Sequence, residues 1–466
     1  MSTETLLPAD TALDATPTRP RAMSIGEHIR RTIALAPPVM LARLGMVVMI
    51  TVDTAMCGRA GAGALAAFAI SMAPQIIMLT ISTGLLTGTV VLTAQSDGAG
   101  ESWRSGIILR YALLIGLVIG LGFAAMLASG ESLLLLLGQN EGLSASGGSV
   151  MEMWAVGVPG LTLYMAASFY LEGLSRPRAG MIVMLLANLL NVALNWVLVF
   201  GHLGFPAMDA AGSALATSIT RWAMFIAIIG YIWFGLDHQR YGIRAKLKGQ
   251  LHIAKRLVTL GAPFGFGIGL ETTAFAALLL FAGNLGPLPT SAYHTAMNFN
   301  ALIYMLALGV ATATAVRVGN AIGRDDPVGM RTAGWVGTCL VVVPMGLAAL
   351  FVVAFPEAVI GFYTNDPIVV PYALAALAVI PAVCVTDGVQ AVLMSALRGA
   401  ADVWIPNTIY LVCFWGLMAP LGWWWGVAQG HGAPGLLWVA SLALTISAVF
   451  AGWRFHVLSR RHIRRA

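Results

Sequence analysis

GLLTGTVVLTAQSDG at residues 84–98 resembles GVATATAVRVGNAIG at residues 309–323. Two further pairs lie at almost the same separation: Ala36-Pro37 with Ala262-Pro263, and LEGLSRPRAG from Leu171 with LMSALRGAAD from Leu393. Each match is weak alone, but the three offsets of 225, 226 and 222 residues are nearly constant. The pattern therefore predicts an internal repeat of two similar halves.

Both halves are too apolar for a protein surrounded by water. Hydrophobic residues make up 58% of the 466 residues and charged residues 10%, and the mean hydropathy is +0.83. Soluble proteins carry about a quarter charged residues. A helix that spans a bilayer needs about 20 mostly apolar residues. We expect twelve such spans, near residues 33–56, 64–95, 107–129, 150–174, 180–201, 211–235, 257–283, 290–321, 332–355, 370–397, 403–427 and 434–456.

Six spans in each half give both halves the same orientation in the membrane, so the repeat axis lies along the membrane normal. The predicted fold is an all-α integral membrane protein with twelve transmembrane helices in two six-helix lobes related by a pseudo-two-fold axis. The expected divisions are a disordered cytoplasmic tail at 1–24, an N-lobe at 25–235, a cytoplasmic inter-lobe loop at 236–256, a C-lobe at 257–457 and a basic cytoplasmic tail at 458–466.

The basic residues test this map, because Lys and Arg gather on the cytoplasmic side of membrane proteins. If the N-terminus is inside, all 26 basic residues fall in inner segments except Arg43, Arg59 and Arg221. We therefore expect both termini to be cytoplasmic. The net charge of +6 then follows from inner loops that face anionic lipid, so we expect membrane lipids and no nucleic acid as partners.

Three carboxylates lie deep within the expected spans: Asp53, Glu271 and Asp387. Each costs about 2.5–3.5 kcal/mol at the bilayer centre, and such residues usually mark an ion or proton path. Along ideal helices, Glu271 is roughly 22 Å from Arg256 and Asp387 roughly 16 Å from Arg398. These similar depths indicate that the second-half pair could share one site.

Three polar, uncharged residues in the same half of the chain are candidate neighbours of Asp53. Asn191 and Asn195 are four residues apart and share a helix face, and Thr217 opens the sixth span. One carboxylate with amide and hydroxyl oxygens suits Na⁺. Burial also favours the neutral form of a carboxylate, so the group could bind a proton instead. Alternatively, the Asn and Thr side chains only form interhelical hydrogen bonds.

Four other polar residues within the spans are candidates for a substrate cavity. Arg43 and Arg221 could recognise an acidic group, or could form structural ion pairs, for example Arg43 with Glu172. His294 and Asn298 lie four apart on one helix, where they could face a cavity or bond to a neighbouring helix.

Enzyme and cofactor motifs are missing from the sequence. It contains no HExxH, no GxSxG with partners and no Walker motif, so we expect neither an enzyme nor a protein that uses ATP directly. The four cysteines show neither a metal-binding spacing nor a disulfide framework, and we expect them to be small buried hydrophobes. No cofactor and no metal beyond a possible Na⁺ are predicted.

A family resemblance is carried by six stretches in order: VDTAMCGRAGAGALAAFA, LNVALNW, LETTAFA, AYHTAMNF, RVGNAIG and VTDGVQ. Together they resemble the multidrug and toxic compound extrusion (MATE) family, in its bacterial NorM-like branch, over roughly residues 30–456. The resemblance implies an inner-membrane exporter that moves amphipathic, often cationic drug-like compounds by alternating access, in exchange for Na⁺ or H⁺. We expect the protein to be a monomer.

The resemblance also assigns site residues. It implies a cation or proton site in the N-lobe at Asp53, Asn191, Asn195 and Thr217, and one in the C-lobe at Glu271 and Asp387. The chain departs from some relatives at Val383, where they have an aromatic residue, which weakens a Na⁺ assignment in the C-lobe. Arg43 and Arg221 are unusual for a cation exporter, so a related flippase for a lipid-linked or acidic substrate is the alternative.

Overall fold

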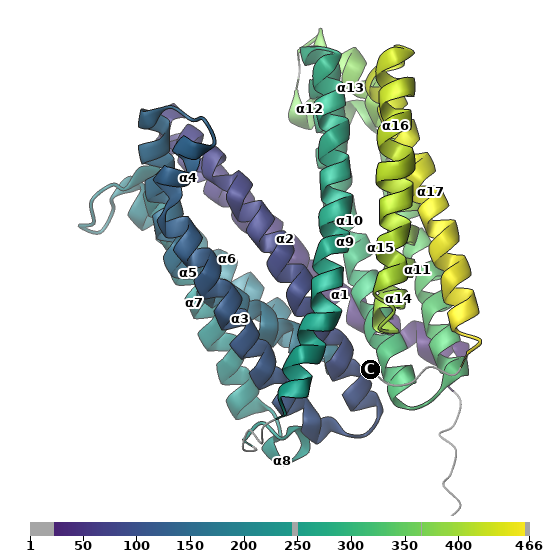
Figure 1. Cartoon of the computed structure of the whole chain (residues 1–466). Coiled ribbons are helices and arrows are strands. Elements are labelled where there is room, and N and C mark those ends of the chain that lie inside the picture. The colour runs from purple at the N-terminus through teal and green to yellow at the C-terminus, as the bar shows by residue number, and fades with distance from the viewer. Residues whose placement is uncertain (1–22, 245–249, 365, 462–466) are drawn as a thin grey trace, which may run out of the picture.

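The computed structural model describes residues 23–244, 250–364 and 366–461, which are folded into helices joined by short turns (Figure 1). Twelve of these helices are long and apolar enough to cross a membrane. The predicted all-α fold with twelve spans is confirmed. Most of the predicted tail at 1–24 and residues 462–466 lie outside the described residues.

The first six spans form the N-lobe. They are α1 (Ile25–Ala60), α2 (Ala62–Gly98), α3 (Ser105–Ala128), α5 (Glu141–Gly173), α6 (Arg178–Phe200) and α7 (Asp209–Gly235). The short helices α4 (Gly130–Leu136) and α8 (His238–Tyr241) lie at opposite ends of this lobe (Figure 1). Helix α5 is the most buried of the six because it packs against α2, α3 and α7.

The last six spans form the C-lobe. They are α9 (Leu251–Asn284), α10 (Pro287–Gly323), α11 (Pro327–Ala354), α14 (Ile380–Gly399), the segment Trp404–Ala428 and α17 (Gly432–Leu458). The eleventh span consists of α15 (Trp404–Tyr410), a π-helical stretch Leu411–Met418, α16 (Ala419–Leu421) and a second π-helical stretch Gly422–Ala428. Its three tryptophans at 423–425 are exposed, as an interfacial anchor requires.

The predicted span at 370–397 is wrong in its first part. Two short helices, α12 (Pro356–Tyr363) and α13 (Val369–Leu377), precede the tenth spanning helix α14. Pro381 lies in the first turn of α14, where its missing N–H is tolerated, and it starts a new helix there. Continuous apolarity concealed this break from the sequence pattern.

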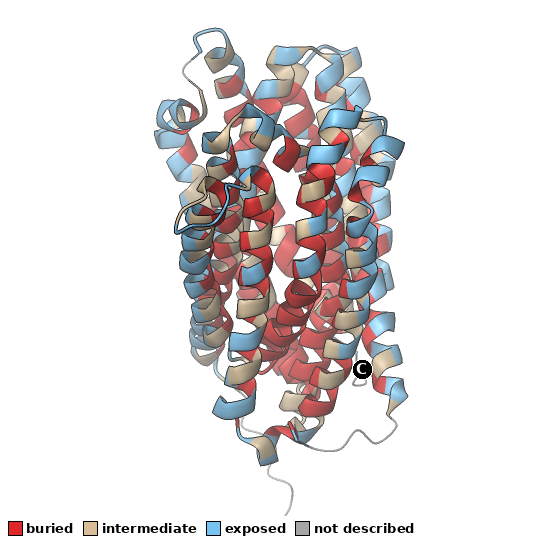
Figure 2. Ribbon diagram, turned by 90° about the vertical axis from the view of Figure 1, so that its left-hand side faces the viewer, coloured by how far each residue is buried: buried red, intermediate tan, exposed pale blue. Residues whose placement is uncertain are grey.

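Buried residues lie on the helix faces that point into each lobe, and exposed residues lie on the outer faces (Figure 2). Large apolar side chains are nevertheless common among the exposed residues, for example Leu189, Phe234, Leu280 and Trp453. A water-facing surface rarely carries so much apolar area. This distribution is that of a protein whose outer faces contact lipid.

The two lobes meet near one end of the molecule and diverge toward the other (Figure 1). Ile25 and Arg460 line one groove, so both described ends of the chain lie at the closed end, which we call the terminal end. The principal contacts between the lobes join α1 to α10, α2 to α9 and α2 to α10. The base of the space between the lobes is therefore closed by two pairs of long helices.

Glycine makes these inter-lobe contacts close. A Cβ on Gly84 would overlap the backbone of Gly265, and a Cβ on Gly261 would overlap the carbonyl oxygen of Leu85. The two repeated stretches also touch each other, since Gly98 lies against Asn320 and Gly323 against Gln95. Small residues allow helix backbones to approach closely in membranes. We call these close contacts, at Gly84, Gly98, Gly261, Gly265 and Gly323, the glycine seal between the two lobes.

Candidate functional site

Asp53 is the centre of a polar cluster inside the N-lobe. Its side chain is 3% exposed on α1. One carboxylate oxygen accepts a hydrogen bond from the Asn195 amide at 2.8 Å, and the other accepts from the Thr217 hydroxyl at 2.6 Å. Asn191 donates to the Thr217 hydroxyl oxygen at 3.2 Å. Helices α1, α6 and α7 therefore bring together all four residues of the predicted N-lobe set.

This cluster is rich in oxygen acceptors. The side-chain carbonyl oxygens of Asn191 and Asn195 are buried and have no hydrogen-bond partner among the described residues. A buried acceptor without a partner is costly. Together with the carboxylate of Asp53, these oxygens are the ligand types that Na⁺ prefers. The residues present fit a small cation, and they equally allow a proton on Asp53.

Arg221 lies next to this cluster and does not line the cavity between the lobes that is described below. It is one helical turn from Thr217 on α7, is 6% exposed and interacts electrostatically with Asp53. Its Nη1 has no hydrogen-bond partner among the described residues. The structure thus places Arg221 beside the N-lobe carboxylate and outside the cavity described below.

A second cluster lies inside the C-lobe. Asp387 on α14 accepts a hydrogen bond from the Asn300 amide of α10 at 3.1 Å. Glu271 on α9 is close enough to act electrostatically on Asp387, and it interacts with Tyr410 of α15. The two predicted carboxylates therefore share one region of the C-lobe.

Arg398 completes the C-lobe cluster, although the sequence analysis assigned it to an inner segment. It lies in the last turn of α14, donates to the Tyr410 hydroxyl at 3.1 Å and acts electrostatically on Glu271. The same analysis missed Asn300 and Tyr410. Both are uncharged, and only their contacts in the structure distinguish them from the other polar residues within the spans.

A cavity of about 290 Å³ lies between the lobes, lined by residues of the same stretches of α2 and α10 that include the contact glycines Gly84 and Gly309. Met46, Thr83 and Val91 contribute from the N-lobe, and Ile268, Met305 and Thr312 from the C-lobe. Three charged side chains also line it: Arg43, Glu172 and Arg398. The wall is mostly apolar with a few polar groups, which is typical of a site for an amphipathic molecule.

Arg43 and Glu172 form the ion pair that the sequence analysis considered. Arg43 Nη2 lies 3.3 Å from each oxygen of Glu172, which is 4% exposed. The guanidinium also lies 5.1 Å from the centre of the Phe169 ring. Arg43 therefore lines the cavity with much of its charge already balanced.

His294 and Asn298 do not line this cavity. Both are exposed on the first turns of α10, and Asn298 accepts a hydrogen bond from the Tyr363 hydroxyl at 3.1 Å. Asn298 and Met305 are seven residues apart and so lie on the same face of α10. The pair therefore lies on the cavity-facing side of α10, nearer the open end.

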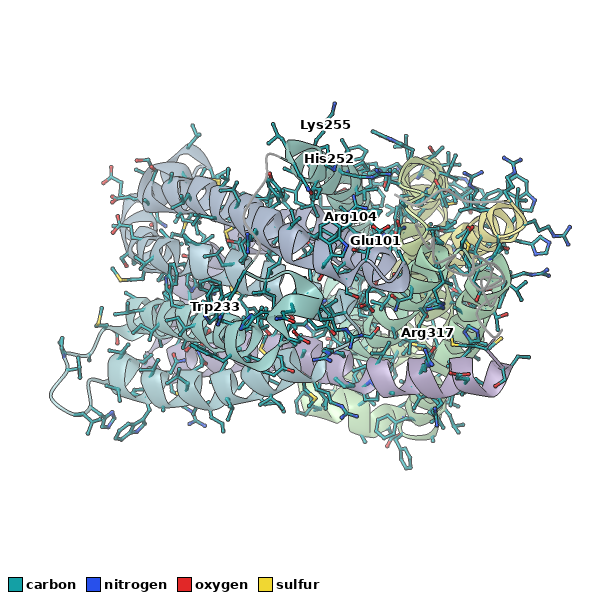
Figure 3. All side chains as sticks on the ribbon, turned by 90° about the horizontal axis from the view of Figure 1, so that it is seen from below. Glu101, Arg104, Trp233, His252, Lys255 and Arg317 are labelled. Carbon is teal, nitrogen blue, oxygen red and sulfur yellow. The ribbon has the colours of Figure 1, made fainter. Side chains whose placement is uncertain are left out.

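Polar side chains lie along the contacts between the two lobes at the terminal end. Glu101 and Arg104, paired at 2.6 Å, lie beside His252 of α9, while Arg317 lies elsewhere on the same end (Figure 3). Arg317 contacts the His28 ring of α1 at 2.9 Å between Nη2 and Nδ1. Side-chain contacts thus supplement the glycine seal.

The model of the MatE family matches residues 38–197 and 263–424, one segment in each lobe. The chain belongs to the MATE family. The two matched segments begin at equivalent positions of the internal repeat. The protein is therefore a multi-pass membrane protein of this transporter family, as the sequence resemblance implied.

Relatives extend along almost the whole chain. A protein of Caulobacter vibrioides described as a probable multidrug resistance protein NorM is 34% identical, with 99% of this chain and 98% of that protein covered. The multidrug resistance protein PmpM of Pseudomonas aeruginosa is 29% identical over 95% of this chain and 94% of that protein.

Solved structures share the fold at low sequence identity. An outward-facing structure of a multidrug resistance MATE transporter has a TM-score of 0.85, with 17% identity and coverage of 94% and 97% of the two chains. A transporter of Pyrococcus furiosus, described by its reversed binding-pocket polarity and a suggested different function, has a TM-score of 0.83 at 16% identity, covering 93% and 96%. These likenesses establish the MATE fold for this chain.

Proposed function

We propose that the protein is a secondary multidrug exporter that moves amphipathic, often cationic compounds out of the cell in exchange for H⁺ or Na⁺. The observation that carries this proposal is Asp53, a buried carboxylate held by the neutral donors Asn195 and Thr217. A charge in such a place is expensive unless a cation neutralises it. Binding in one state and release in another would couple ion flow to transport. The multidrug resistance names of the relatives support the substrate class.

The arrangement of the lobes supports alternating access. The basic residues favour cytoplasmic termini, so the terminal end would face the cytoplasm and the diverging end the outside. In this conformation, a substrate in the cavity could leave outward but could not return inward. Export would then require the glycine seal to open while the other end closes. One chain contains both lobes and the cavity, so we expect a monomer to suffice.

The proposed roles differ between the two clusters. Asp53, Asn191, Asn195 and Thr217 would bind the coupling ion in the N-lobe, whereas Glu271 and Asp387 would bind it in the C-lobe. Each cluster has one arginine nearby, Arg221 in the N-lobe and Arg398 in the C-lobe, but the N-lobe cluster offers two carbonyl oxygens without hydrogen-bond partners among the described residues, those of Asn191 and Asn195, whereas the C-lobe cluster offers one, that of Asn300. We therefore favour the N-lobe cluster as the main coupling site.

The test is export from inverted membrane vesicles with the Na⁺ gradient and the pH gradient imposed separately. A fluorescent cationic dye serves as the substrate. We expect one gradient to drive dye accumulation and the other to have little effect. Accumulation that ignores both gradients would contradict ion coupling and therefore the proposal.

A flippase for a lipid-linked or acidic substrate is the second candidate. The observation in its favour is that two of the three charged residues that line the cavity, Arg43 and Arg398, are basic. In the vesicle assay, an anionic amphiphile would compete with the dye if this candidate were correct. A cationic amphiphile would compete if the exporter proposal is correct.

A further inference from the structure

A groove of about 720 Å³ opens on the outside of the C-lobe at the terminal end, and no residue of either carboxylate cluster lines it. Helix α11 contributes one long wall, with Trp335 and Leu340. The start of α1 contributes Ile25 and Ile29, and the turn after α17 contributes Arg460. The groove therefore joins the first helix of the N-lobe to two helices of the C-lobe.

The chemistry of the groove changes along its length. Two exposed arginines, Arg331 and Arg460, line its part nearest the terminal end. From Arg331, α11 runs roughly 13 Å to Leu340 at 1.5 Å per residue. The lining along this run is apolar apart from Thr332. Positive charge at one end and an apolar wall beyond it match an amphipathic anion that lies along the membrane normal.

A second groove begins where the first one meets Trp335. It has a volume of about 390 Å³, lies between α11, α14 and α17, and is lined by apolar residues such as Val385, Val389 and Val449. Trp335 forms part of both grooves. One headgroup near the arginines could thus extend one chain into each groove. A ligand with two acyl chains fits both spaces, whereas a single-chain anion would leave the second one open to bulk lipid.

We propose that these joined grooves bind an anionic phospholipid of the cytoplasmic leaflet, with its headgroup between Arg331 and Arg460. The proposal rests on the cytoplasmic placement of the termini in the proposed function. Basic residues near an anionic membrane surface attract its headgroups, and two arginines do so here. Because Ile25 and Ile29 complete the site, the lipid contacts both lobes. Its binding favours the conformation in which the start of α1 rests on the C-lobe.

Cys339 provides a reporter for the site. It lines the first groove and is exposed, whereas the other three cysteines of the chain are buried. The full-length protein in detergent is labelled with a maleimide in the presence of dioleoyl phosphatidylglycerol. Dioleoyl phosphatidylcholine, with the same chains and no net charge, is the matched lipid. We expect phosphatidylglycerol to slow labelling about fivefold or more, and phosphatidylcholine to slow it much less.

The variant that tests the headgroup site is Arg331→Gln with Arg460→Gln. Both side chains are on the surface, so the fold is not expected to change. The matched control is Arg178→Gln with Arg240→Gln, two exposed residues at the N-lobe side of the same end. We expect the control to retain slowing by phosphatidylglycerol, and the test variant to require about tenfold more of this lipid for the same effect.

Three outcomes would overturn the proposal. The two lipids could slow labelling equally, or the two double variants could behave alike. Alternatively, Cys339 could be protected without added lipid and remain so whatever is added, which would indicate that another part of the chain fills the groove. Labelling does not depend on transport. A failed vesicle assay with lipid-specific protection would therefore remove the exporter proposal and leave the lipid site in place.

Discussion

Asp53 accepts hydrogen bonds on both carboxylate oxygens, and its donors are neutral. Arg221 acts on it electrostatically, but no ion pair joins the two side chains among the described residues. The carboxylate is therefore held in place by neutral donors and has no ion-paired partner among the described residues. Such a group can gain and lose a cation, which a tightly paired carboxylate cannot do easily.

Asp53→Asn tests this role. The amide keeps the shape of the side chain but cannot be ionised, so we expect export to fall to about a hundredth or less of the wild-type rate, roughly 3 kcal/mol in the barrier. Dye accumulation in vesicles measures the rate, and immunoblotting measures expression, which should not change. Asp209→Asn is the control, because Asp209 is exposed at the start of α7. Normal export from the Asp53 variant would rule out a coupling role.

The C-lobe carboxylates are tested by Glu271→Gln and Asp387→Asn, made singly. Each removes a charge from the cluster that includes Arg398 and Tyr410. We expect each variant to lower export at most to about a tenth of the wild-type rate, which corresponds to about 1.4 kcal/mol in the activation barrier, because the N-lobe site remains. If both variants export normally, the C-lobe cluster is structural.

The sequence predicted the residues of the N-lobe cluster better than those of the C-lobe cluster. Asn191 and Asn195 share a helix face by their spacing alone, and the structure brings that face to Asp53. Nothing local connects Arg398 to Glu271, because they lie on different helices, α14 and α9, and both interact with Tyr410 of α15 only in the folded chain. A boundary error of a few residues was enough to place Arg398 in a loop.

At the scale of helices, the contact between α2 and α9 depends on the absence of side chains. Gly84, Gly261 and Gly265 allow the two backbones to touch. Apolar periodicity identified both spans but could not identify this contact, since a glycine in a transmembrane helix does not reveal which helix it faces. Apolar periodicity also could not separate α13 from α14, because the two helices form one continuous apolar run in the sequence.

Gly261→Ala should destabilise this closed conformation. The new methyl group would overlap the Leu85 carbonyl oxygen, and such overpacking costs about 1–3 kcal/mol. We expect a lower thermal unfolding midpoint in detergent. Gly269→Ala on the same helix is the control, because no other group lies within 4 Å of a Cβ there. Equal midpoints for the two variants would show that the backbone contact adds little stability.

At the scale of the whole molecule, the constant repeat offset predicts two lobes of equal span number, as the structure has them. It does not predict at which end they meet. That outcome depends on which repeated glycines face the other lobe, and here Gly98 and Gly323 do so. Orientation relative to the membrane remains a prediction from the basic residues.

A disulfide across the seal should stop transport. A Cβ built on Gly319 lies 3.0 Å from the Cβ of Ala94, near the separation of about 3.5–4.5 Å found in disulfides. We expect Ala94→Cys with Gly319→Cys to lose export under oxidising conditions and to recover it with a reductant. Export by each single variant should not change under oxidising conditions. Full export from the oxidised double variant would mean that this contact does not need to open.

If export is coupled to an ion gradient as proposed, the glycine seal also limits how much of that gradient is lost without transport. Backbone packed against backbone leaves little room for a file of water molecules, so we expect the closed end to conduct few protons when no substrate is present. A displaced α9 would create such a leak. We expect vesicles with Gly261→Ala to lose an imposed pH gradient faster than vesicles with Gly269→Ala, in the absence of any substrate. A seal of small residues would thus set the energetic efficiency of export as well as its direction.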